Sequence, residues 1–281
     1  MADCLTDQMI GSCRSDLLGH LTPGAGRLVR LQARAPSLQL RCVILKSQYA
    51  AFQSNREQDL GIFRQRADGS GAAERLTTAE AGAAHIPESW SPDGSRLLYN
   101  VVSKDGLAAL WVLNLATRKA EPFGGVTSPV STLPAAVFSP DGKWVAYASS
   151  DQRQSSAVYV QPFPATGARY QISRNEDDAH HPVWAPDGKA LYFTPGPGGR
   201  INEVKVSTQP TFTFGEATTF PGPFANVPPN QERPYDISRD GLRFIGLANA
   251  TDSPQPGKGV APQIRVVLNW AEELTRLVPS K

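Results

Sequence analysis

The sequence predicts an all-β protein built from repeated strand-and-turn units, and a recurring corner motif carries this prediction. Three of the four corners are Pro-Asp-Gly turns that follow an aromatic residue, and all four precede a second apolar run. Proline fixes φ at the first central position, aspartate bonds its own backbone, and glycine adopts the left-handed conformation that reverses the chain. The corner residues are Pro92, Asp93 and Gly94, then Pro140, Asp141 and Gly142, then Pro186, Asp187 and Gly188, and finally Asp240 and Gly241, which follow Ile237 and carry Arg239 in place of proline.

The spacing of these corners is the second observation. Their first turn residues, Ser91, Ser139, Ala185 and Ser238, are separated by 48, 46 and 53 residues. A period of this size made of strands and turns is typical of a propeller or a solenoid. We therefore expect a β-propeller of four-stranded blades, about five or six in number, with an irregular or incomplete first blade.

Composition agrees with a globular protein and excludes several classes of function. The chain has 281 residues, of which 40% are hydrophobic, with 24 Gly and 24 Pro, and its net charge of +2 gives no electrostatic case for nucleic acid or an anionic membrane. The three cysteines, Cys4, Cys13 and Cys42, have the spacing of neither a disulfide framework nor a zinc site. No apolar run reaches the ~18 residues of a membrane-spanning helix.

The start of the chain is the least regular part. Leu40, Cys42 and Ile44 alternate with polar neighbours, which indicates a strand. The segment 46–48 stands where the first corner would fall, so the first unit is expected to contribute only strands two to four of a blade. We therefore divide the chain into a poorly defined segment, 1–47, and a propeller, 48–281. Either the first segment completes the ring or an open blade edge remains, through which chains could associate.

The later units are more complete. The second, third and fourth are each expected to supply four strands, and the fifth begins at 235–237 and 243–246. A further strand is expected at 264–270, followed at 271–278 by a short helix or the last outer strand.

The corner with its flanks, Phe138 to Tyr147, resembles the repeat of TolB-type, WD-repeat-like bacterial propellers. The ending, with Tyr235 to Ser238 and Ile264 to Trp270, is similar to that of propeller domains C-terminal to serine/threonine kinase or regulator domains. The resemblance covers roughly residues 48 to 278, and it implies a periplasmic or cell-envelope location. No signal peptide is visible, which by itself predicts the cytoplasm, so the compartment is left open.

No motif predicts catalysis. The sequence lacks a Gly-x-Ser-x-Gly elbow and the kinase glycine-rich and His-Arg-Asp loops, and the turn at 196–199 lacks the lysine of a phosphate loop. We expect no enzyme activity and no cofactor. The corner aspartates have structural roles within their turns, so they are not expected to bind metal.

One polar cluster is a candidate binding site. Asp177, Asp178, His180 and His181 lead into an inner strand near the mouth of the central channel, and blade symmetry adds His85 and Glu232. Histidines beside a carboxylate are the ligand types of zinc, and they could also hold an acidic group of a partner or form a solvated rim. Because the register is uncertain, no metal site is assigned.

These observations favour a non-enzymatic propeller that binds a protein or peptide, or acts as a scaffold, through its loop rim and channel mouth. The alternatives are a sensory propeller separated from its kinase and, less favoured, the gating propeller of an oligopeptidase-like hydrolase. No nucleic acid partner and no membrane insertion are expected.

Overall fold

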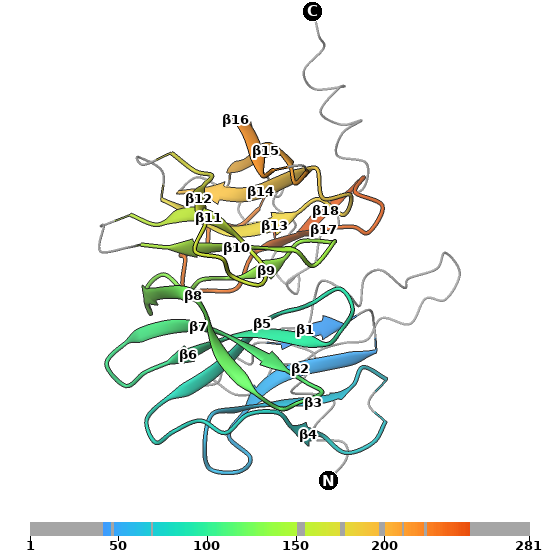
Figure 1. Ribbon diagram of the computed structural model, residues 1–281, viewed down its shortest axis with the longest axis vertical. Coiled ribbons are helices and arrows are strands. Elements are labelled where there is room, and N and C mark those ends of the chain that lie inside the picture. Colours follow the sequence, from blue (N-terminus) through green and yellow to red (C-terminus); the bar gives the residue numbers. More distant parts are fainter. Residues whose placement is uncertain are drawn as a thin grey trace, which may run out of the picture.

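The chain forms β-sheets throughout the part that its computed structural model describes, which comprises residues 42–45, 48–68, 70–150, 155–174, 178–196, 200–209, 211–221 and 224–247. These residues form four four-stranded antiparallel sheets and one two-stranded sheet, and the sheets follow one another along the chain (Figure 1). The sheets confirm the all-β, blade-like architecture. The strand expected at 264–270 and the element at 271–278 lie outside the described residues.

Each sheet is built from consecutive strands. The first contains β1 (Cys42–Leu45), β2 (Tyr49–Ser54), β3 (Gly61–Arg66) and β4 (Glu74–Arg75), and the second contains β5 (Ala84–Trp90), β6 (Arg96–Val102), β7 (Leu107–Asn114) and β8 (Ala120–Pro129). The third contains β9 (Val137–Phe138), β10 (Trp144–Ser149), β11 (Ala157–Pro162) and β12 (Tyr170–Gln171). The fourth contains β13 (Ala179–Trp184), β14 (Ala190–Pro195), β15 (Arg200–Ser207) and β16 (Thr213–Pro221), and the last pair is β17 (Tyr235–Ile237) and β18 (Phe244–Gly246).

The first sheet differs from the expectation of three strands. β1 pairs with β2 in antiparallel register, from Cys42 opposite Phe52 to Leu45 opposite Tyr49. The alternating residues around Cys42 do form a strand, and this strand completes the first blade without a Pro-Asp-Gly corner. The first sheet thus draws its inner strand from the segment that precedes residue 48.

The four corners form as the sequence predicts. Each glycine has a positive φ, from 71° to 75°, and donates its N–H to a carbonyl three residues earlier at 2.8 to 2.9 Å. The aspartates bind the amide two residues later, as Asp141 Oδ1 binds the Lys143 N–H at 3.1 Å. Three of them also accept the hydroxyl of the first turn residue, which Ala185 cannot supply. The corner residues therefore have the structural role that was predicted for them.

Neighbouring corners also touch one another. A Cβ added at Gly142 would meet Pro92 Cδ of the preceding blade at 3.3 Å, and one at Gly241 would meet Pro186 Cδ at 3.7 Å. The corner glycine therefore serves both its own turn and the packing of one blade on the next.

Gly142→Ala is expected to cost about 2 kcal/mol of unfolding free energy, because alanine disfavours the left-handed conformation and its Cβ crowds Pro92. Gly167→Ala is the matched control, since Gly167 has φ +88° and open space around its Cβ position, and it is expected to cost only about 1 kcal/mol. Urea denaturation of both variants measures the difference. Equal losses of unfolding free energy in the two variants would show that the contact between Gly142 and Pro92 does not contribute to stability.

Four apolar clusters join successive sheets. The cluster between the first and second sheets includes Ile62 and Leu97, and the one between the second and third includes Leu110 and Tyr147. The cluster between the third and fourth sheets contains Val158, Leu191 and Phe193, and the one that holds the last pair contains Phe224 and Tyr235. Burial of apolar side chains between successive sheets therefore stabilises the assembly.

The antiparallel order sorts the connections onto two edges of the blades. The corners and the turns between third and fourth strands lie at one edge, which we call the corner edge. The turns between second and third strands and the links from one blade to the next lie at the other, which we call the rim edge. No helix long and apolar enough to cross a membrane is found among the described residues.

Candidate binding site at the rim edge

The predicted site residues start the inner strands, but the structure does not gather them into one open site. Asp177 lies outside the described residues. His180 and His181 lie at the start of β13, and His85 takes the corresponding place on β5. Glu232 is exposed on the connection before β17. The histidines thus lie near the starts of β5 and β13, and they are buried.

His180 and His181 are interior residues, with exposed fractions of 2% and 0%. Their Nδ1 atoms are 2.8 Å apart, and Nε2 of His181 is 2.9 Å from the carbonyl oxygen of Gln231. Because a carbonyl only accepts, His181 carries a proton on Nε2, and in the neutral ring its Nδ1 then accepts from the Nδ1–H of His180.

A local backbone irregularity places these rings. The register of β13 on β14 shifts between His180 and Val183, and His181 has φ of 55°. The Tyr235 hydroxyl donates to the His181 carbonyl oxygen at 3.0 Å. The two histidines therefore link the fourth sheet to the β16–β17 connection and β17, which is a structural task. Burial lowers the pKa of His180 to about 4, against a smaller opposing effect of the Asp178 charge.

Asp178 is half-buried and bonded within the rim edge. Its Oδ1 accepts hydrogen bonds from the backbone N–H and the hydroxyl of Ser156, at 3.0 and 2.7 Å. Asp178 thus fastens the β10–β11 connection to the start of β13. Among the described residues of the predicted cluster, the histidines are buried and Asp178 is half-buried, whereas Glu232 is exposed to solvent.

His85 is also buried, at 8% exposure, beneath the rim edge of the first two sheets. Its Nδ1 lies 2.9 Å from Thr77 Oγ1, and its ring packs edge-on against Tyr99. Burial lowers the pKa of His85, and the Asp59 and Glu80 carboxylates act in the opposite direction. His85 therefore lies close to two acidic groups that the sequence analysis did not single out.

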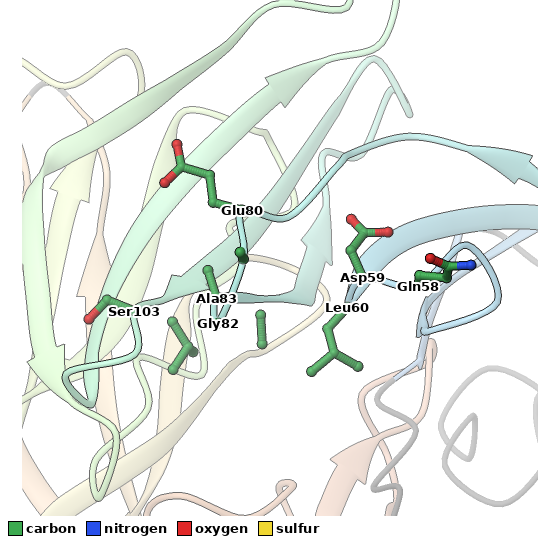
Figure 2. A pocket seen from close by; sticks show the side chains of 10 residues that line it. Gln58, Asp59, Leu60, Glu80, Gly82, Ala83 and Ser103 are labelled. Carbon is green, nitrogen blue, oxygen red and sulfur yellow. The ribbon is translucent and has the colours of Figure 1, made fainter.

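Those acidic groups border a hollow of about 320 Å³, which we call the rim hollow. It is lined by residues 58–60 of the β2–β3 turn, 80–84 of the β4–β5 link and 102–103 at the end of β6 (Figure 2). A parallel bridge between Leu60 and Ala84 joins the first two segments, and the His85 N–H donates to the Leu60 carbonyl at 2.9 Å. Three rim connections from two blades thus form one concave surface.

The charge of the rim hollow is acidic. Asp59 and Glu80 are the charged residues among its lining, while Leu60, Ala83, Ala84 and Val102 supply apolar surface. Asp59 is held in place, since its carboxylate accepts from Arg75 and from the Ala79 N–H at 2.6 Å. Glu80 is exposed on the link between the blades. The hollow therefore combines a fixed carboxylate, a solvent-facing carboxylate and an aliphatic floor.

A metal centre finds no support in the part of the chain that the structure describes. No three His, Cys, Asp or Glu side chains gather there closely enough to hold a metal ion. The His180–His181 pair uses Nδ1 of both rings and Nε2 of His181 in hydrogen bonds.

The sequence analysis missed the rim hollow because its residues carry no motif. The lining comes from three separate connections, which carry Leu60, Ala81 to Ala84, and Ser103. Only the register of the sheets brings these connections together. A signal was nevertheless present, since the Asp-Leu pair at 59–60 and the Ala-Gly-Ala run at 81–83 both fall on connections at the rim edge.

Comparison with known proteins bears on the fold. No protein-family model matches the chain. An alignment 116 positions long, which covers 37% of this chain and 17% of the other protein, is 30% identical to dipeptidyl-peptidase 5 of Porphyromonas gingivalis.

Solved structures give broader coverage at low identity. The match to TolB from Acinetobacter baumannii covers 72% of this chain and 47% of the TolB chain, with a TM-score of 0.55 and 18% identity. A puromycin-hydrolyzing peptidase of Mycobacterium tuberculosis matches 74% of this chain and 34% of its own, with a TM-score of 0.51 and 19% identity. Oligogalacturonate lyase from Vibrio parahaemolyticus matches 74% of this chain over 58% of its own length, with a TM-score of 0.51 and 13% identity.

The chain spans less than two thirds of each of these proteins. The successive four-stranded sheets and these likenesses define a β-propeller. Its fold is TolB-like, as the repeat of corners predicted.

Proposed function

We propose that this propeller is a non-enzymatic module that binds a protein or peptide at the rim hollow. The observation that carries the proposal is the hollow itself, in which connections from two blades enclose about 320 Å³. Binding residues tend to lie on loops that a rigid scaffold positions, and this volume is at the lower end of the range of ligand sites. The hollow therefore suits one inserted side chain of a larger partner.

Exposed apolar residues extend the surface beyond the hollow. Leu107 and Val130 are 47% and 41% exposed, and they lie beside the β6–β7 turn, where the Val130 N–H donates to the Gly106 carbonyl at 2.8 Å. Ser103, at the start of the same turn, lines the hollow. Apolar surface beside a polar hollow is typical of a protein interaction site.

Ala83→Trp is expected to weaken binding strongly, because the indole fills the hollow from the half-buried position of Ala83. A displayed library of random peptides is selected on the full chain, and the selected peptides are then tested on two variants. Ala165→Trp is the control, since Ala165 is exposed at the corner edge.

The proposal expects the selected peptides to bind Ala165→Trp normally and Ala83→Trp at least about tenfold more weakly, which corresponds to 1.4 kcal/mol. Equal binding to both variants, or failure to select any peptide, would contradict it. Circular dichroism and the thermal midpoint confirm that both variants are folded.

A second candidate is a propeller that gates a peptidase. The 116-residue match to dipeptidyl-peptidase 5 and the fold of the puromycin-hydrolyzing peptidase favour it. Under the binding proposal, the purified chain does not hydrolyse dipeptidyl-coumarin substrates. Hydrolysis that is retained through repeated purification would support a peptidase instead. The sensory role beside a kinase stays a prediction.

A further inference from the structure

We infer that the rim hollow takes a lysine side chain of the partner, with the ammonium group between Asp59 and Glu80. This inference rests on the proposed function, because it names the partner chemistry for the same hollow. It is carried by charge complementarity, by the shape of the hollow and by the hydrogen bonds that Asp59 already makes.

The charge around the hollow is negative. Asp59 shares the Arg75 guanidinium with Glu57, and Glu57 also interacts with Arg56, so with Glu80 the hollow and its border carry three carboxylates and two cations. The adjoining β6–β7 turn adds Lys104 and Asp105, both exposed and opposite in charge. An incoming cation therefore meets an excess of carboxylate, while an incoming anion is repelled.

The apolar lining of the hollow favours a side chain with an aliphatic stem. Leu60, Ala84 and Val102 are half-buried and form its apolar part. Figure 2 shows Asp59 on the β2–β3 turn and Glu80 on the β4–β5 link, with Ser103 on the third connection. Lysine buries its methylene groups along apolar surface while its charged end stays at a polar border. The methylene groups of a lysine would thus meet apolar lining, and its ammonium group would meet carboxylates.

The hydrogen bonds of Asp59 favour lysine over arginine. Arg75 binds Oδ1 and the Ala79 N–H binds Oδ2, so both oxygens already hold one donor each. An arginine fork needs two free oxygens side by side, whereas an ammonium group points three donors at separate acceptors. The lone pairs left on Asp59 and the carboxylate of Glu80 suit the ammonium group.

The test uses the ¹⁵N-labelled full chain and two small probes, Nα-acetyl-lysine-N-methylamide and its norleucine analogue, which lacks the charge. The lysine amide is expected to shift the amide signals of Asp59, Ala83, Ala84 and Ser103 in a saturable manner, with the norleucine amide at least about tenfold weaker. Glu80→Gln is expected to weaken lysine binding about fivefold, as for a partly exposed ion pair. Glu121→Gln, which removes an exposed carboxylate on β8, leaves it unchanged.

Equal shifts with the norleucine amide, or none with the lysine amide, would overturn the inference. The proposed function is judged separately by the selected peptides. Peptides that bind the native chain but not Ala83→Trp, and that need no lysine, would support peptide binding at the rim hollow. They would refute the inference that the hollow takes a lysine side chain. Peptides whose binding falls when one lysine is changed to norleucine, and that also fail on Ala83→Trp, support both.

Discussion

Phe193→Ala is expected to lower the free energy of unfolding by about 3 to 5 kcal/mol. Phe193 is 0% exposed on β14 and belongs to the cluster that joins the third and fourth sheets. Removing its ring leaves a cavity between two blades, lined by residues such as Val158 and Leu191 on strands that cannot move together without breaking their ladders. The loss therefore includes the cavity as well as the buried ring.

Phe214→Ala makes the same chemical change at a surface position. Phe214 lies on the outermost strand of the fourth sheet and is 43% exposed, so its loss is expected to stay below about 1 kcal/mol. Urea denaturation followed by tryptophan fluorescence gives both values. Similar losses at the two positions would show that the sheets are not held together by the cluster between them.

Lowering the pH from 7 to 5 is expected to remove about 2 kcal/mol of stability through His180 alone. Burial lowers the pKa of His180 from 6.5 to about 4, so the unfolded chain takes up a proton at a pH where the folded chain does not. The stabilising effect of the neutral ring is complete above pH 6.5 and declines as the pH falls toward 4. His85, whose pKa is also lowered by burial, adds in the same direction.

His180→Gln is the comparison for this pH dependence, because glutamine offers a neutral donor and does not titrate. Urea midpoints at pH 7, 6 and 5 are expected to fall less steeply for the variant than for the native chain. The corner carboxylate of Asp93 titrates separately, since the Ser91 hydroxyl and the Ser95 hydroxyl and amide hold its pKa at about 2, and its contribution is lost only below pH 3.8. Identical slopes for the two chains would refute the role assigned to the buried pair.

The repeat corners were predictable from the sequence because their conformation is local. Proline, aspartate and glycine determine the turn within five residues, and the strands on either side follow from alternation. β8 and β16 are much longer than the other two fourth strands, β4 and β12, because their pairing with β7 and β15 continues along most of their length. β1 was foreseen as a strand, but its place in the first sheet was not, since no corner motif marks the connection to β2.

The candidate site was only partly predictable. The sequence indicated that His85, His180 and His181 begin inner strands, and they do. Their burial could not be read from the sequence, because it depends on the shift of register at His181 and on the Gln231 carbonyl from a connection fifty residues away. The rim hollow depends in the same way on three connections that meet only in the folded sheet.

The most direct test of the binding role is amide hydrogen exchange of the full chain with and without a selected peptide. The rim-hollow account predicts slower exchange at residues 58–60, 80–84 and 102–103, with the corner edge unchanged. Slower exchange confined to the corner turns, or to β13 and the connection that carries Glu232, would contradict it and place the binding surface elsewhere on the propeller.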